Sequence, residues 1–215
     1  MKKTKFKFIA SIVALVLVLG ASLSIVFFKK EDSNAADNPV AQVVKPKKTP
    51  TTTTPTSTLP PLPQPEDSPA NPNAKVPVNQ IGSIEIPKLN MTQNVYEGVT
   101  LTVLNVGPGH WPGTAEPGGY GNTVIAGHRV THSKPFRNVD KLVAGDDIFV
   151  TTAKGKFNFK VTSIEIVYPK DIWIVDQTPG FRLTLFACHP PGSATQRIVV
   201  HAELVDPPFK IPANL

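Results

Sequence analysis

The chain has 215 residues and a formal net charge of +6 at pH 7, but this charge is unevenly distributed. Residues 1–78 carry ten lysines against five acidic residues, whereas residues 79–215 carry twelve basic and eleven acidic residues. The second part is nearly neutral and has no run of basic residues, which argues against a nucleic-acid partner because such partners need a clustered basic face. Cys188 is the only cysteine, so no disulfide can form within the chain.

The N-terminal segment begins with four lysines and continues with an uncharged apolar run over residues 8–28. A helix needs about 20 such residues to cross a bilayer. A cleaved signal peptide is the alternative, but its apolar core spans about 7–15 residues and ends at a small-x-small site. Here the run ends in FFKKED, so we expect an uncleaved transmembrane anchor. Four lysines before the run and two directly after it predict that residues 1–7 are cytoplasmic and that the chain beyond the anchor lies outside the plasma membrane.

The next segment, residues 29–78, is dominated by proline and threonine. Eleven prolines lie between Pro39 and Pro77, and a run of four threonines starts at Thr51. Such a composition favours an extended chain of about 3 Å per residue rather than a packed core. We therefore predict an extracellular stalk over residues 29–78 and a folded domain over residues 79–215.

The folded domain has the pattern of a β protein, with short apolar segments separated by turn residues. It shows little helical signal: a short helix is expected within 99–106 and one helical turn within 134–143. The prediction is an all-β fold with six or seven strands, closed into a barrel with one or two short helices; an open sandwich is the alternative. The predicted strand segments are residues 82–89, 122–128, 147–168 (two strands around a Lys-Gly turn, the second bending near Thr162), 181–188 and 196–205.

The segment TLFACHPPGSATQR contains the candidate nucleophile. A cysteine reacts as its thiolate, so a catalytic Cys188 needs a nearby histidine or cation and donors for an oxyanion. Arg197 begins the next predicted strand, and the loop between them can bring it level with Cys188, where it could donate to a substrate carbonyl and favour the thiolate. The structural alternatives are a small buried cysteine and a solvated arginine.

Five histidines are candidates for the partner of the cysteine. His128 leads because it ends the strand-like NTVIAGH, and His110 follows because GPGHWPG is a turn-rich loop that could border a cleft. His189 is adjacent to the cysteine and so points to the opposite face of its strand. His201 lies about 13 Å along the strand from the arginine, and His132 lies in a polar loop.

These motifs resemble those of a known family. TLFAC resembles the TLxTC signature of sortases, the cysteine transpeptidases that attach proteins to the Gram-positive cell wall, and the arginine nine residues after the cysteine matches as well. NTVIAGHR is similar to the sortase histidine strand, so His128 falls on the catalytic histidine of the family. The resemblance spans residues 81–206. GPGHWPGTA, GHRVTHSKPFRNVDKL and ACHP resemble the corresponding segments of class E sortases, or of the nearby class D.

The resemblance implies a sortase-type barrel and a two-step acyl transfer. Cys188 would attack the Thr–Gly bond of an LPxTG or LAxTG sorting signal, His128 would protonate the leaving amine, and Arg197 would hold the substrate and the oxyanion. An amine on a cell-wall precursor or a pilin would then take the acyl group. No cofactor or metal is implied, and calcium is not indicated, because no compact acidic cluster is present. Further substrate-side candidates are Thr184, Ala187, His110, Trp111 and Trp173, the last in the loop 169–180.

One departure from the family concerns Ala187, which stands where sortases usually have threonine before the cysteine. The missing hydroxyl implies that the oxyanion depends more on Arg197 and on backbone N–H groups. An L,D-transpeptidase is a poor alternative, because it has histidine two residues before its cysteine and this chain has Phe186. The remaining alternative is a non-catalytic anchored β-domain for surface adhesion or assembly, in which Cys188 would be buried and inert.

Overall fold

The computed structural model describes residues 59–211. The expected cytoplasmic residues 1–7, the expected anchor over 8–28 and the first part of the expected stalk lie outside the described residues. Within the part that is described, no helix has the length and apolar character needed to span a membrane.

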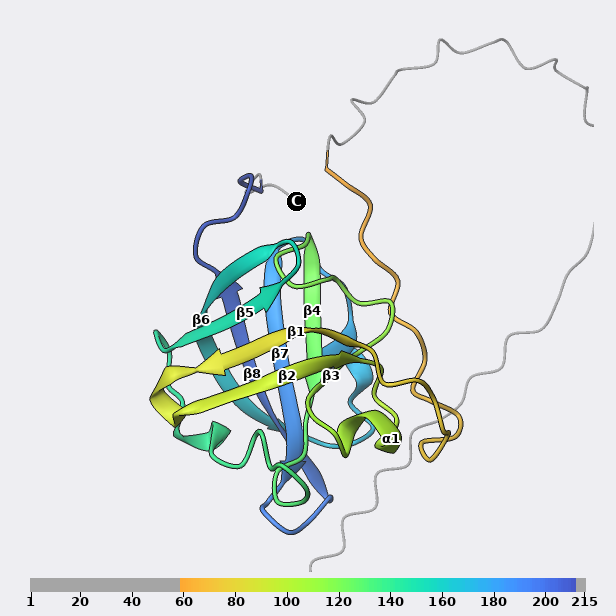
Figure 1. Cartoon of the computed structure of the whole chain (residues 1–215). Coiled ribbons are helices and arrows are strands. Elements are labelled where there is room, and N and C mark those ends of the chain that lie inside the picture. The colour runs from red at the N-terminus through yellow and green to blue at the C-terminus, as the bar shows by residue number, and fades with distance from the viewer. Residues whose placement is uncertain (1–58, 212–215) are drawn as a thin grey trace, which may run out of the picture. The chain divides into compact units, whose positions relative to one another are not determined.

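Eight strands of the described chain form one closed barrel, in the order β1-β2-β3-β4-β7-β8-β6-β5 (Figure 1). Neighbouring strands are antiparallel except for two parallel pairs, β2 with β3 and β4 with β7. The prediction of an all-β closed barrel is confirmed, and the open sandwich is wrong. The strands are β1 (Gln80–Ile86), β2 (Met91–Glu97), β3 (Gly109–His110), β4 (Gly121–Ala126), β5 (Asp147–Thr152), β6 (Gly155–Val167), β7 (Phe181–His189) and β8 (Gln196–Leu204).

The predicted strand over 82–89 ends earlier than expected, at Ile86, because Pro87 opens a 3-10 turn and has no N–H for a strand ladder. The short helix expected within 99–106 is present as α1 (Leu101–Leu104). The helical turn expected within 134–143 is also present, as Val139–Lys141. Strands β2 and β3 were not predicted from the sequence.

The predicted bend in the long strand β6 is a β-bulge. Val161 pairs with Ala202 of β8, but Ser163 pairs with the preceding residue His201, so Thr162 is the extra residue. Its hydroxyl donates to the carbonyl of His201 at 3.2 Å. A bulge bends its strand and increases the local twist, which allows β6 to pair with both β5 and β8 around the barrel wall.

Two apolar clusters lie on opposite sides of the barrel wall. The larger fills the barrel interior and includes the completely buried rings of Phe136 and Phe159. The smaller lies on the outer face, where Val124 and Val199 of the sheet pack against Ile174 and Val175 of the loop between β6 and β7. Because side chains alternate along a strand, β7 contributes Leu183, Leu185 and Ala187 to the interior cluster, and the residues between and after them, Thr184, Phe186 and Cys188, to the outer face.

Residues 59–78, called the strap below, were predicted as the last part of the stalk, and they run beside the barrel to α1 (Figure 1). The N–H of Glu66 donates to the carbonyl of Pro112 at 2.9 Å, and the carbonyl of Glu66 accepts from the indole N–H of Trp111 at 2.7 Å. The carbonyl of Pro72 accepts from the first N–H of α1, at Leu101, at 2.7 Å. The strap is therefore hydrogen-bonded to the barrel at both of these points.

Candidate active site

Strands β7 and β8 bring the cysteine and the arginine together. In their antiparallel register Cys188 lies directly opposite Arg197, and opposite residues of such a pair have Cα atoms about 4.5–5.5 Å apart and side chains on the same face. This face is the outer one, because Ala187 on one side of the cysteine and Ile198 next to the arginine belong to the barrel core. Cys188 is partly exposed and free.

The arginine is held by the loop that precedes its strand. Nη1 of Arg197 donates to the carbonyls of Ala194 and Gln196, each at 2.9 Å. A guanidinium carries five N–H donors, so bonds from one of its nitrogens fix the position of the group while the other nitrogens can donate to a bound carbonyl. The loop 190–195 therefore presents Arg197 beside the thiol.

His128 reaches the same edge of the barrel from the neighbouring strand β4. The parallel register of β4 and β7 pairs Ala126 with Phe186, and the N–H of Gly127 donates to the Phe186 carbonyl at 3.1 Å. His128 and Cys188 each follow this last registered pair by two residues. Position 127, directly before His128, must be glycine because a Cβ there would lie 2.6 Å from the ring of Phe136. The two candidate catalytic residues are therefore at the same level of the sheet.

The environment of the His128 ring determines which nitrogen can exchange a proton. Nε2 lies 2.9 Å from Oδ1 of Asn105, which only accepts, so Nε2 carries a proton and Nδ1 is the titrating nitrogen. The ring stacks on that of His132, with centroids 5.0 Å apart. Burial and the nearby His132 both lower the pKa of His128. Asn105 was not recognised in the sequence, because it lies 23 residues before His128. His132 was considered only as a residue of a polar loop, and its stacking on His128 was not predicted.

A groove of about 290 Å³ leads away from this edge. Its surface is mainly apolar. The groove reaches the cysteine because it is lined by Arg197, which lies opposite Cys188, and by Phe186, which precedes Cys188 by two residues on the same face of β7. The β6–β7 loop and the strap lie on it as well. The loop contributes Tyr168 and Ile172, and the strap contributes Ser68, Pro69 and Pro72. Trp111, which follows β3, lines the groove as well.

The substrate-side candidates predicted from the sequence lie in different places. Trp111 lines the groove, with its ring centroid 6.1 Å from that of Phe186. Trp173 is 47% exposed and stacks on His201, with centroids 6.4 Å apart. The side chain of Thr184 is covered by the β6–β7 loop, where its hydroxyl donates to Oδ1 of Asn122 at 2.8 Å. Trp111 is therefore placed to touch a peptide in the groove, whereas the hydroxyl of Thr184 is occupied by Asn122 of β4.

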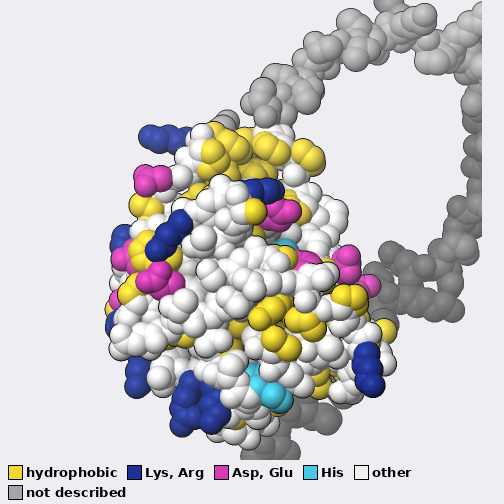
Figure 2. Space-filling view, in the orientation of Figure 1, with side chains coloured by type: hydrophobic (Ala, Val, Ile, Leu, Met, Phe, Trp, Pro, Cys, Tyr) yellow, Lys and Arg dark blue, Asp and Glu magenta, His cyan; other side chains and the backbone are white. Residues whose placement is uncertain are grey.

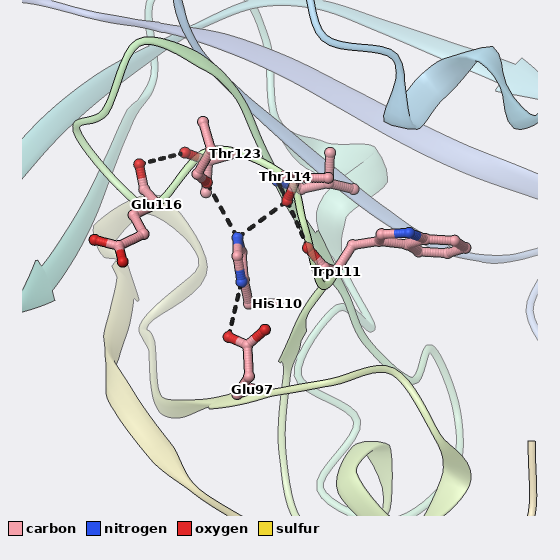
Figure 3. A network of polar contacts seen from close by, with 8 residues as sticks. Glu97, His110, Trp111, Thr114, Glu116 and Thr123 are labelled. Carbon is pink, nitrogen blue, oxygen red and sulfur yellow. Dashed lines mark hydrogen bonds and ion pairs between the residues drawn. The ribbon is translucent and has the colours of Figure 1, made fainter. Parts of the chain in front are cut away.

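His110 is buried in a network of polar contacts that holds the segment before β4 (Figure 3). Its Nδ1 lies 2.9 Å from a carboxylate oxygen of Glu97, and its Nε2 lies 3.0 Å from both the carbonyl of Ala115 and the hydroxyl of Thr114. Thr114 in turn donates to the carbonyl of Trp111 at 2.7 Å, and the indole points away from His110. With both ring nitrogens engaged, His110 fixes the position of Trp111.

Ala187 lies in the core of the barrel and is 2% exposed. Its methyl group points into the barrel, away from the outer face that carries Cys188. A contact between Ala187 and a substrate would therefore involve its backbone.

Arg129 directly follows His128 and is a further residue of this region whose role the sequence did not reveal. It is 2% exposed, and each of its guanidinium nitrogens has a partner. Nε donates to the carbonyl of Arg137 at 3.0 Å, Nη2 donates to Asp140 at 2.7 Å, and Nη1 donates to Nδ1 of His189 at 3.0 Å. The sequence GHR showed that a charged arginine follows the histidine, but it did not show that this arginine is buried.

A closed barrel that presents a thiol, a guanidinium and an imidazole at one edge defines a class of protein, the cysteine-dependent acyl-transfer type. The sortase domain model matches residues 84–205, which is more than half of the chain. The chain belongs to the sortase family, whose members are cysteine transpeptidases.

Individual relatives agree with this assignment. The chain is 33% identical over 152 residues to Sortase SrtE1 of Streptomyces coelicolor, covering 63% of this chain and 43% of that one. It is 32% identical over 130 residues to Sortase A of Streptococcus agalactiae, covering 58% and 52%. The chain thus spans about half the length of these curated relatives.

Solved structures give the same result. Sortase E1 of Streptomyces coelicolor, solved with a tripeptide in its active site, matches with a TM-score of 0.58 and 31% identity over 62% of this chain and 92% of that one. The Sortase D5 transpeptidase of Clostridium perfringens matches with a TM-score of 0.56 and 35% identity over 61% and 83%. These comparisons are compatible with class E or class D.

Proposed function

We propose that this chain is a membrane-anchored sortase that cleaves the Thr–Gly bond of an LPxTG- or LAxTG-type sorting signal and transfers the new acyl group to an amine. The observation that carries the proposal is the register of three strands. Cys188 lies opposite Arg197, and His128 continues β4 to the level of Cys188. A thiol, an oxyanion donor and a proton carrier thus meet at one end of an apolar groove.

The reaction follows from these three groups. The thiolate of Cys188 attacks the threonine carbonyl, and N–H groups of Arg197 donate to the oxyanion that forms. Collapse of this intermediate breaks the C–N bond, and His128 as imidazolium gives its Nδ1 proton to the leaving glycine amine. The thioester that remains is attacked by the acceptor amine, His128 takes up the proton of that amine, and the thiolate leaves.

The groove suits an extended peptide with apolar side chains before the scissile bond. Its apolar surface includes Trp111, Ile172 and Phe186, and Arg197 lies near the thiol. The class E resemblance and the matches to Sortase E1 support an LAxTG signal beside the LPxTG signal. For the acceptor we propose the amine of a cell-wall precursor or of a pilin, as expected for the family.

The proposed location rests on the sequence of residues 1–28. An apolar run of sufficient length with lysines before it supports a single membrane span, with residues 1–7 in the cytoplasm and the catalytic domain outside. Sorting signals on exported proteins and cell-wall amines are both found on that side of the membrane.

The test is cleavage of fluorogenic LPxTG and LAxTG peptides by the full chain in detergent, with mass spectrometry to detect the thioacyl-enzyme. Replacing Cys188 by Ala should abolish cleavage and acylation, and His128→Ala and Arg197→Ala should each lower kcat/KM at least about 100-fold. Arg182→Ala is the matched control, because this exposed arginine lies on β7 away from the groove. A Cys188→Ala protein that cleaves at the wild-type rate would show that the reaction does not use this thiol.

A further inference from the structure

Beyond the three groups already assigned, the buried guanidinium of Arg129 joins the two strand ends that carry the proposed catalytic pair. Arg129 is the residue after His128, and its partner His189 is the residue after Cys188. The bond between them is 3.0 Å long. It therefore connects positions that are each one residue away from the proposed proton carrier and the proposed nucleophile.

The place of this bond in the sheet gives it a mechanical role. Strands β4 and β7 are hydrogen-bonded in register only as far as Ala126 and Phe186, with one further bond from the N–H of Gly127. Beyond that point the chain of β4 leaves the sheet, while β7 continues along β8. The side-chain bond from Arg129 to His189 holds the two chains together where the backbone ladder has ended.

The chemistry of the bond restricts the state of His189. A guanidinium can only donate, so Nδ1 of His189 must accept and cannot carry a proton. The other bonds of Arg129 keep its head from turning away, since Nε and Nη2 donate to Arg137 and Asp140. A buried guanidinium that loses partners is costly, so the group is fixed in one orientation.

We propose that Arg129 and His189 form a clamp that sets the separation of His128 and Cys188, with Arg129 and His189 acting as positioning residues. The proposal rests on the proposed function. Proton transfer requires heavy atoms about 2.6–3.2 Å apart in the reacting complex, and a displacement of about 1 Å can lower the rate about 100-fold. Neither clamp residue has to touch the substrate for its loss to slow the reaction.

The test compares two replacements of His189 in the full chain. Asn keeps an oxygen that can accept from Arg129, whereas Leu has similar size and no acceptor. We expect His189→Leu to lower kcat by about 10- to 100-fold with little change in KM, and His189→Asn to recover most of the loss. The control is Arg182→Ala, an exposed substitution on β7 that leaves every contact of Arg129 in place and should leave kcat within about threefold of the wild type. Equal kcat values for the Leu and Asn variants, or a change confined to KM, would overturn the clamp.

A second measurement separates failure of the clamp from failure of the proposed function. The rate of Cys188 alkylation by iodoacetamide depends on pairing of the thiolate with His128 and needs no peptide. If the clamp acts as proposed, His189→Leu shifts this rate toward that of His128→Ala, and His189→Asn does not. If the wild type and His128→Ala react equally fast, the Cys188–His128 pairing and the proposed function are wrong. If those two differ but His189→Leu matches the wild type, only the clamp is wrong.

Discussion

Asn122 is one of the side chains that fasten the β6–β7 loop to the barrel, and its removal gives a prediction that can be worked out from hydrogen bonds. Its amide Nδ2 donates to the carbonyls of Ile174 and Asp176 at 3.1 and 3.2 Å, and its Oδ1 accepts from Thr184 at 2.8 Å. Asn122 is 6% exposed. Asn122→Ala therefore removes three hydrogen bonds in a region with little access to water.

The expected magnitude follows from the value of each bond. A hydrogen bond contributes about 0.5–1.5 kcal/mol net. The Thr184 hydroxyl has a second partner, Nδ1 of His201 at 3.4 Å, so its bond counts at the lower end of the range. We expect Asn122→Ala to lower the free energy of unfolding by about 2–3 kcal/mol. For a domain of this size that corresponds to roughly 5–10 °C in Tm.

The assay combines urea unfolding with hydrogen exchange of the loop amides. In Asn122→Ala the midpoint should fall and the amides of residues 172–177 should exchange faster, while the core strands keep their relative protection. Thr184→Val is the matched control, because it removes one of the three bonds and leaves both bonds to the loop in place. It should lower stability by about 1 kcal/mol and leave loop exchange unchanged. A loss below about 0.5 kcal/mol for Asn122→Ala with unchanged loop exchange would refute this reasoning.

Three further predictions concern the histidine, the strap and the core. Burial and the nearby His132 lower the pKa of His128, so His132→Gln should raise that pKa. Because the reaction needs His128 protonated, the alkaline limb of the pH–rate profile should move to higher pH. An alkaline limb at the wild-type pH would contradict this. A Cβ at Gly113 would clash with the carbonyl oxygen of Gln64 in the strap and lie 2.8 Å from the backbone N of Glu66, so Gly113→Ala should speed proteolysis within residues 59–78. The control Gly145→Ala, also at positive φ but in open space, should not. Ala187→Thr adds a methyl and a hydroxyl to the core and should lower stability by about 1–3 kcal/mol without raising kcat; a gain in kcat would show that the hydroxyl reaches the reacting carbonyl.

The strands that the sequence revealed are those with a clear apolar pattern. In β7 and β8 the apolar residues recur densely because one face fills the barrel and part of the other is covered by a loop. Strand β2, with the sequence MTQNVYE, buries only Val95 completely, so its pattern resembles a polar loop. Strand β3 has two residues and exists because Gly109 and His110 fit between β2 and β4. Such a strand is defined by its neighbours and has no periodicity of its own.

The candidate site was predictable as a set of residues but not as an arrangement. The spacing of Cys188 and Arg197 could be interpreted as two adjacent strands joined by a loop, since these residues are close in sequence. His128 lies 60 residues before the cysteine, and only the parallel pairing of β4 with β7 places it there. His110 looked like a cleft residue because of its glycine-rich loop, and the buried contact with Glu97 could not be seen from that loop.

The surface charge of the domain agrees with the near balance found in residues 79–215. Figure 2 shows basic and acidic side chains scattered around the edge of one face, with apolar side chains in small groups between them. Several opposite charges are paired across strands, such as Lys156 with Glu85 and Lys160 with Asp147. These exposed pairs contribute little stability. The positive charge of the chain is therefore concentrated before the domain, where lysines flank the expected anchor.

The topology explains why three reactive groups meet at one edge of this barrel. Strands β4 and β7 are parallel, so the residues at and beyond their C-terminal ends lie on the same side, and the antiparallel β8 begins on that side. A histidine after β4, a cysteine near the end of β7 and an arginine near the start of β8 are therefore brought together by strand direction alone. Because the three groups lie at or beyond strand ends, where the backbone hydrogen bonds of the sheet stop, the sheet alone does not fix the distances between them. Side chains must then supply the rigidity that catalysis needs. The buried Arg129 meets this requirement between β4 and β7, and the carbonyls of the β7–β8 loop meet it for Arg197.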